Sequence, residues 1–286
     1  MSATLDSIIQ TRRVSAEGDQ SVHEASYDDR ATLWTVNGGY LGASILCAAQ
    51  DVAKFERPVN LTVQYLRPVG VGPVSIALSS VRKTSAAELL SARLSQADKH
   101  AVSAELWLSS AQGDELIKSP PMPMVPHPDE LKSVEQIMEP DEPPRHKFWS
   151  VFDERPIHRI DSFKRRNMPG HSLRWMRYRD SALATPFIRA GATLPIIDML
   201  GVTAASNARG GNILTSLAPT LSLTAHFYEL DALDGWLLGD ATAECVRHGM
   251  INTRVRIWSL TGALVAQGLT QMIMRPGEGV YVKPKS

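Results

Sequence analysis

A proline-rich segment divides the chain near its middle and restricts the fold more than any other sequence feature. Residues 118–147, KSPPMPMVPHPDELKSVEQIMEPDEPPRHK, contain eight prolines. Proline removes a backbone donor and interrupts both helices and central strands. We therefore predict an extended linker with one short helix near Glu130–Met138. The predicted organisation is an N-terminal domain at 1–118, the linker at 119–147 and a C-terminal domain at 148–286.

The two halves on either side of this linker resemble each other. LTVQYLRPVGVGPVSIALSSV begins at Leu61, and LTAHFYELDALDGWLLGDATA begins at Leu223. Both open with Leu-Thr, carry an aromatic residue at the fifth position, break at a turn and resume as an alternating strand. A second pair of segments, 93–110 and 256–273, keeps an offset of about 160 residues, and a preserved offset indicates an internal duplication.

Each half also has one apolar helix candidate before its long strands, at about 38–54 and about 185–201. The rest is a meander of antiparallel strands, without the repeated strand–helix alternation of a parallel sheet. A helix that is apolar on most faces must be buried. We therefore predict an α+β fold in which a curved antiparallel sheet wraps one central helix in each half. Because exposed strand edges tend to be covered, the two halves should pair into one sheet.

Several classes of chemistry lack their sequence signals. Basic and acidic residues are balanced at 30 each, so the composition does not indicate a nucleic-acid partner. Two cysteines and scattered histidines do not form a metal-binding pattern. The chain has no G-x-S-x-G, P-loop or G-x-G-x-x-G motif. We expect neither a metal nor a cofactor.

The sequence also bears on the compartment. We expect no membrane span, since no uninterrupted apolar run reaches about 18 residues, and the first residues lack the pattern of a secretory signal. Two cysteines fit a reducing environment. We therefore expect a cytoplasmic protein.

Motifs in both halves are similar to those of a known family. WTVNGGYLGASIL at 34–46 resembles a Gly-Gly helix start, and VNLTVQYLRPV at 59–69 resembles the strand that follows. In the second half, LPIIDMLG at 194–201 resembles a central helix with an aspartate, and APTLSLTAHF at 218–227 resembles a strand with a threonine. Their order and spacing resemble the acyl-CoA thioesterase II type of the thioesterase-like superfamily. The resemblance implies a double hotdog fold and a hydrolase acting on acyl thioesters in lipid metabolism.

The resemblance further implies a catalytic site in the second half, where an aspartate, a threonine or serine and a glutamine hold a water against the thioester carbonyl. Asp198 matches the aspartate and Thr220 the threonine, and Ser222 follows on the same predicted strand face. The residues alone leave open that Asp198 lies on a wet face of an amphipathic helix. The resemblance favours a role as general base for the attacking water.

The glutamine position is displaced in this sequence. The family spacing falls on Thr270, and Gln271 is its neighbour. A shift of one residue turns a strand side chain to the opposite face. Three explanations stay open: a bulge returns Gln271 to the site, Thr270 replaces the glutamine, or hydrolysis is weakened. We take Gln271 as the third catalytic candidate and Thr270 as a substrate-binding candidate.

Further residues are candidates for substrate binding. Gly38 and Gly39 allow close backbone approach to the sheet or to a ligand, and Gly39 is a candidate backbone donor. By number parity His226 shares a face with Thr220 and Ser222, so it is either a pocket residue or a structural histidine. Four basic residues are candidates for contacts with the phosphates of CoA: Arg67, Lys83, Arg247 and Arg254.

The leading hypothesis is hydrolysis of an acyl thioester by water that Asp198 and Thr220 activate. Two alternatives stay open, because one fold serves many functions. The first is a related enzyme that performs dehydration or cyclisation on an acyl or polyketide-like substrate, and the second is a non-catalytic acyl-binding protein. The expected partner is acyl-CoA or another acyl thioester, and a homodimer is a further arrangement that the sequence leaves open.

Overall fold

The computed structural model describes residues 4–111, 118–138, 145–157, 170–208 and 216–276. The first half consists of two helices, one 3-10 turn and six strands: α1 Leu5–Ile9, β1 Arg12–Glu17, β2 Gln20–Tyr27, η1 Asp29–Ala31, α2 Gly38–Gln50, β3 Pro58–Tyr65, β4 Gly72–Lys83, β5 Ala87–Gln96 and β6 Lys99–Ser109. The linker region contains η2 Pro128–Glu130, α3 Val134–Ile137 and η3 Lys147–Val151. The second half consists of β7 Phe152–Pro156, β8 His171–Tyr178, α4 Pro186–Ala208, β9 Ser216–Leu217, β10 Thr220–Phe227, η5 Leu230–Ala232, β11 Leu237–Arg247, β12 Met250–Ser259, β13 Leu264–Ile273 and β14 Arg275–Pro276.

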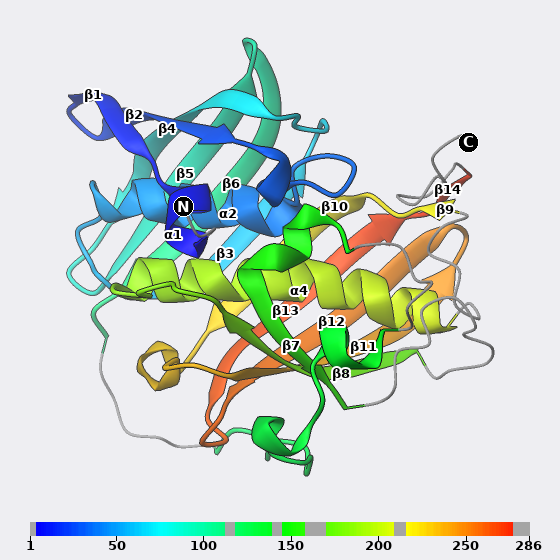
Figure 1. Ribbon diagram of the computed structural model, residues 1–286. Helices are drawn as coiled ribbons and strands as arrows, with labels where there is room; N and C mark the ends of the chain where they lie inside the picture. Colours follow the sequence, from blue (N-terminus) through cyan, green and yellow to red (C-terminus); the bar gives the residue numbers. More distant parts are fainter. Residues whose placement is uncertain (1–3, 112–117, 139–144, 158–169, 209–215, 277–286) are drawn as a thin grey trace.

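Strands of both halves form one continuous antiparallel sheet of twelve strands (Figure 1). Its order is β1-β2-β4-β5-β6-β3-β10-β13-β12-β11-β8-β7. From the centre outward, the first half runs β3-β6-β5-β4-β2-β1 and the second half runs in the equivalent order, β10-β13-β12-β11-β8-β7. At the centre, Thr62 of β3 pairs with Thr224 of β10. These threonines hold equivalent positions in the two sequence repeats, so a local two-fold axis passes beside them. The expected pairing of the halves into one sheet is confirmed.

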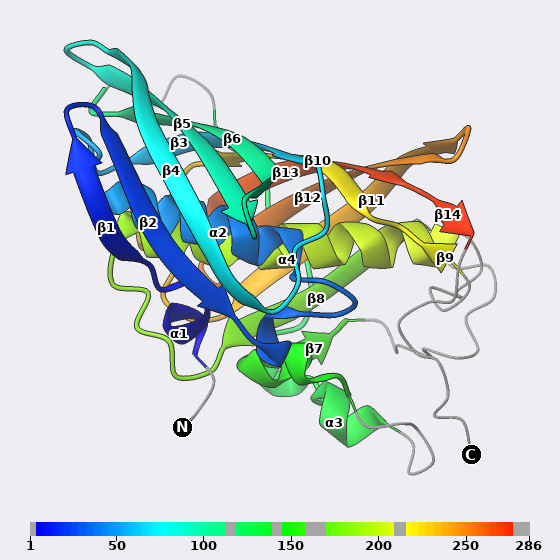
Figure 2. The same ribbon diagram turned by 90° about the horizontal axis from the view of Figure 1, so that it is seen from above.

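The two long helices lie side by side on the same face of this sheet, which curves around them (Figures 1 and 2). Each helix is enclosed by the sheet on one side and by the other helix on another, which explains why both are apolar on most faces. Tyr40 and Ile45 of α2 and Ile197 and Leu200 of α4 are fully buried. The expected α+β fold with two central helices is confirmed.

Helix α4 is unusual in its length and composition. Over Pro186–Asn207 it is long and apolar enough to cross a membrane, but 89% of its most apolar stretch is buried inside the fold. Its apolar character is therefore accounted for by its place in the core of the molecule.

A tight contact between the two helices requires glycine at position 39. A Cβ atom at Gly39 would lie 2.5 Å from the Leu194 carbonyl carbon and would also overlap the backbone of Pro195. Real side chains do not tolerate such separations, so only a hydrogen at this position lets the first turn of α2 meet the middle of α4. The second glycine of the Gly-Gly pair is thus explained by packing between the helices.

The proline-rich linker packs on the molecule. The side chains of Met122, Val125 and Leu131 pack against a cluster on the second half of the sheet that includes Trp175 and Trp258. The indole N–H of Trp175 donates to the carbonyl of Pro126 at 3.0 Å. Residues 118–127 have no regular secondary structure, and the described part of the segment covers large aromatic side chains that would otherwise face water.

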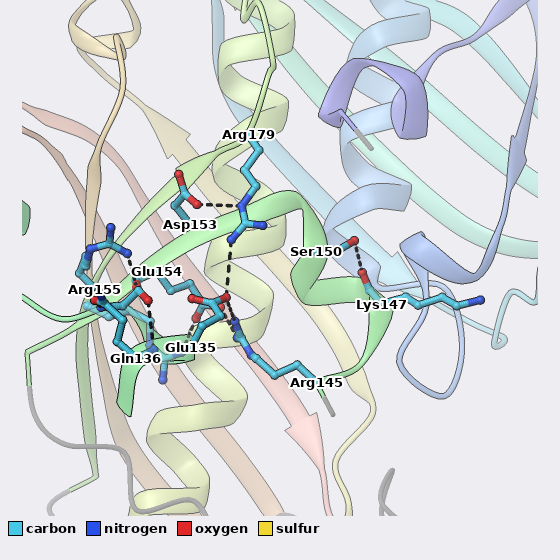
Figure 3. A network of polar contacts seen from close by, with 11 residues as sticks. Glu135, Gln136, Arg145, Lys147, Ser150, Asp153, Glu154, Arg155 and Arg179 are labelled. Carbon is cyan, nitrogen blue, oxygen red and sulfur yellow. Dashed lines mark hydrogen bonds and ion pairs between the residues drawn. The ribbon is translucent and has the colours of Figure 1, made fainter. Parts of the chain in front are cut away.

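A polar network fixes the end of the linker (Figure 3). Glu154 of β7 is fully buried, and it pairs with Arg145 of the linker and with Arg174 of β8. Arg145 also contacts Glu135 of α3, which is joined in turn by Arg179. A buried carboxylate is tolerated only when such partners satisfy it, so the network ties the linker to the edge of the sheet.

We predict that Gly39→Ala destabilises the protein. In an ordinary helix this change stabilises by about 1 kcal/mol, but here the added methyl group overlaps the backbone of α4, and overpacking typically costs about 1–3 kcal/mol. The measurement is the free energy of unfolding in urea. Gly235→Ala is the control, since a Cβ atom at Gly235 meets open space. A Gly39→Ala variant as stable as the parent would contradict the packing argument.

Candidate active site

Asp198 lies in the middle of α4 and is almost fully buried, with 5% of its surface exposed. Its two carboxylate oxygens have different partners. Thr220, the first residue of β10, donates its hydroxyl hydrogen to Oδ1 at 2.8 Å. Asn37, which precedes α2, donates from Nδ2 to Oδ2 at 2.6 Å. The structure therefore brings Asp198 and Thr220 together, and it adds a residue from the first half of the chain.

Asn37 is the residue that sequence reasoning missed. It is the N-cap of α2, and its Oδ1 accepts a hydrogen bond from the Gly39 N–H at 3.0 Å. An asparagine directly before an apolar helix is a recognisable N-cap signal. The signal indicates where the helix begins, but it gives no indication that the amide nitrogen meets a carboxylate on the other central helix.

The first turn of α2 also acts on the charge of Asp198. Burial raises the pKa of Asp198, and the Thr220 hydroxyl, the N–H groups of Gly39 and Gly38 and the Asn37 amide oppose this rise. A helix N-terminus carries a partial positive charge, which favours an anion. The Gly39 N–H, the candidate backbone donor to a ligand, donates to Asn37 Oδ1 in the structure. Burial, together with the charge of Asp198, raises the pKa of Tyr65 well above its ordinary value, and this phenol donates to the Gly38 carbonyl at 2.8 Å.

A bulge at the start of β10 determines which of its side chains face Asp198. Thr220 pairs with Met272 of β13, whereas Ser222 pairs with Gln271, so the register shifts between the two. Met272 is buried and Gln271 is exposed, and residues paired across a ladder share a face. Thr220 therefore faces α4, and Ser222 faces the opposite side.

The expectation from number parity that Ser222 and His226 share the face of Thr220 is therefore wrong, because the bulge turns the chain by one residue. His226 is exposed, and its Nδ1 lies 3.5 Å from the side-chain nitrogen of Asn60 on β3. Neither Ser222 nor His226 lines the pocket described below.

The two residues considered for the glutamine position lie away from the carboxylate. Gln271 is on the outer face of β13 and donates to Asn252 at 3.1 Å. Thr270 is buried and shares a hydrogen bond of 2.6 Å with Thr253, beneath Gly201 of α4. The bulge is in β10 and not in β13, so it re-orients Thr220 and leaves Gln271 outside.

A pocket of about 360 Å³ opens next to Asp198. Its described walls come from residues 33–38, 41 and 65–69 in the first half, and from residues 198, 199, 202 and 218–221 in the second. Most of the side chains are apolar, and among the described lining residues Asp198 and Arg67 are the charged ones. Asn37 and Thr220 line the same pocket. The carboxylate and both of its side-chain partners can therefore meet a small ligand there.

The four basic candidates are distributed differently. Arg67 lines the pocket and is exposed. Lys83 pairs with Asp19 and with the buried Glu88, and Arg254 pairs with Glu244. Arg247 is exposed and does not line this pocket. Within the described part of the chain, no group of three or more histidine, cysteine, aspartate or glutamate residues is arranged to hold a metal ion.

Two family models match the chain. The acyl-CoA thioesterase N-terminal domain matches residues 28–109, and the acyl-CoA thioesterase C-terminal domain matches residues 128–274. The second match alone covers more than half of the chain. The chain belongs to the acyl-CoA thioesterase family. Family membership makes it a hydrolase of the thioesterase type.

Solved structures with the same fold extend over nearly all of this thioesterase. A hot dog fold protein of unknown function from Alicyclobacillus acidocaldarius has a TM-score of 0.79 at 18% identity, with 96% of this chain and 98% of that chain covered. The acyl-CoA thioesterase II TesB2 from Mycobacterium marinum has a TM-score of 0.74 at 18% identity, with 96% and 98% covered. A TesB protein from Mycobacterium avium subspecies paratuberculosis has a TM-score of 0.75 at 19% identity, with 95% and 98% covered. No curated protein matches the chain in sequence. The expected double hotdog fold is confirmed.

We predict that ionisation of Asp198 costs the thioesterase stability. Burial raises the pKa of this carboxyl above its ordinary value of 3.8, so the folded state binds the proton more tightly than the unfolded state. Stability is then lost as the pH rises from about 3.8 through the folded-state value. An Asp198→Asn variant carries an amide at this position, and the amide does not ionise.

The measurement for this prediction is the free energy of unfolding of the parent and of Asp198→Asn as a function of pH. The free energy of unfolding of Asp198→Asn minus that of the parent should increase as the pH rises from about 3.8 to the folded-state pKa, and it should then become constant. A difference that shrinks with rising pH would show that the folded state favours the carboxylate.

Proposed function

We propose that this thioesterase hydrolyses acyl-CoA to a free acid and CoA, with Asp198 as general base and Thr220 as its partner in holding the water. The observation that carries the proposal is the hydrogen bond from Thr220 to a buried carboxylate in the wall of an apolar pocket. A buried carboxylate with a raised pKa is a better proton acceptor at neutral pH than an exposed one. Such a group in a cleft is typical of a functional site.

The reaction needs one base. The water oxygen forms a bond to the thioester carbonyl carbon while Asp198 takes a proton from the water. The tetrahedral intermediate then collapses, the carbon–sulfur bond breaks, and the proton passes from Asp198 to the departing CoA sulfur. Because Thr220 donates its own hydrogen to Asp198, its oxygen lone pairs are left to accept a hydrogen bond from the same water.

The composition of the pocket favours hydrolysis over the alternative reactions. Dehydration of an acyl substrate needs a base for one proton and a separate acid for the departing hydroxyl. The described lining residues offer one carboxylate and no imidazole, and the phenol of Tyr65 is engaged with the Gly38 carbonyl. Simple acyl binding gives no reason for a carboxylate in an apolar wall, since burying an anion is unfavourable.

The lining residues also support an acyl substrate. Trp34 and Leu66 are large apolar side chains exposed at the pocket, with 41% and 55% of their surface accessible. Such surfaces commonly bind apolar groups. Arg67 is the cation of the described lining, and CoA carries several phosphate charges, so its field should attract this substrate.

We predict that Asp198→Asn lowers kcat for acyl-CoA hydrolysis by about 10²- to 10⁴-fold, because this is what general-base catalysis typically contributes. Thr220→Val should lower kcat less, since it keeps the base and removes only the partner hydroxyl. The measurement is thiol release from a panel of acyl-CoAs. Ser222→Ala and Gln271→Ala are matched controls on the outer face and should keep the parental rate. Equal rates in Asp198→Asn and the parent would exclude the mechanism.

We predict a separate effect for the pocket cation. Arg67→Ala should raise KM for acyl-CoA by about two- to fivefold and leave kcat unchanged, because an exposed charge contributes up to about 1 kcal/mol. The effect should shrink at high salt. Arg247→Ala is the control, as an exposed arginine that does not line the pocket. If the parent and Arg67→Ala have the same KM, Arg67 does not contribute to substrate binding.

A further inference from the structure

We infer that Asn37, in the first half of the chain, is a positioning residue of the active site, which orients Asp198 for its reaction with water. The inference rests on the proposed function, since it concerns the same carboxylate. It also supplies the side-chain amide that the sequence led us to expect at Gln271. That residue faces away from the pocket, whereas the Asn37 amide nitrogen lies 2.6 Å from Asp198 Oδ2.

The orientation of the Asn37 amide is determined by its neighbours. A backbone N–H can only donate, so the Gly39 N–H requires the oxygen of the amide on its side, at 3.0 Å. The amide nitrogen must then face Asp198, where it donates to Oδ2. The N-cap bond and the carboxylate bond thus use opposite ends of one planar group, and α2 holds that group in place.

The bond from Asn37 leaves the other carboxylate oxygen for catalysis. Oδ2 is engaged by the amide, while Oδ1 is shared with Thr220, whose hydroxyl lines the pocket. The carboxylate therefore cannot rotate freely about its Cβ–Cγ bond. With the plane of the group fixed, Oδ1 and the Thr220 oxygen form a pair that can hold one water between them.

The amide also acts on the charge of Asp198. Its N–H opposes the effect of burial, so it keeps the pKa of Asp198 lower than burial alone would. The other titratable or charged groups facing this carboxylate in the described pocket are Tyr65 of β3 and Arg67 after it. The raised pKa of Tyr65 keeps it neutral at ordinary pH, and arginine keeps its charge. A pH effect of changing Asn37 is therefore assigned to Asp198.

Asn37→Ser is the variant that separates positioning from helix capping. Serine is as good an N-cap as asparagine, so α2 should keep its start. Its side chain is shorter and has no amide, so it cannot make both bonds. We expect a thermal stability close to that of the parent and a kcat lowered by about tenfold or more. The acidic limb of the kcat/KM profile should move up by about one pH unit, because a charged carboxylate loses a hydrogen bond.

Asn37→Asp is the second variant. It keeps the size of the side chain and the cap oxygen but places a second carboxylate beside Asp198. Two neighbouring carboxylates raise the pKa of one of them strongly, so the acidic limb should move further than in Asn37→Ser. A thermodynamic cycle completes the test, because Asn37→Ser should change kcat little in an Asp198→Asn background when the two residues act as a unit.

A measurement without substrate distinguishes failure of this inference from failure of the proposed function. The pKa of Asp198 is read from the carboxyl ¹³C signal of labelled protein, assigned by its loss in Asp198→Asn. If the parent hydrolyses no acyl-CoA but Asn37→Ser raises this pKa, hydrolysis is wrong and the coupling stands. If Asn37→Ser leaves both this pKa and the pH profile unchanged, Asn37 is only a helix cap and the inference is overturned, whatever the change in kcat.

Discussion

The contact between the backbones of two helices, at Gly39 of α2 and Pro195 of α4, determines the geometry of the rest of the site. Without a side chain at position 39, the N-terminus of α2 reaches the middle of α4, one turn before Asp198. The carboxylate then meets a helix N-terminus, where partial positive charge and backbone donors favour an anion. A packing constraint in the core thus provides the electrostatic environment of the candidate active site.

The duplication explains why the site draws on both halves. A local two-fold axis beside Thr62 and Thr224 places the central helices next to each other, so the start of one lies against the middle of the other. The halves have since diverged in their chemistry. The second supplies the carboxylate and the hydroxyl, whereas the first supplies an amide and the positive end of its helix.

Much of the fold and part of the site could be predicted from the sequence. The repeated strand pattern predicted the sheet, and the two apolar stretches predicted the central helices at nearly the right places. Asp198 and Thr220 were found through the family resemblance, and they meet as expected. What the sequence could not reveal is the bulge at Thr220, because alternation along a strand gives no sign of an inserted residue. Nor could it show that Asn37 approaches Asp198, since that contact depends on how two distant helices pack.

The central pairing of β3 with β10 has a consequence for how the chain is made. β3 is completed long before β10, so during synthesis on the ribosome the first half has an open strand edge with no partner of its own. Open edges are prone to pair with other chains, which makes this stage the most exposed to misassembly. Asn37 and Asp198 are separated by 161 residues. The candidate site therefore cannot assemble until the second half has emerged, and a chain that ends before Asp198 would lack its carboxylate.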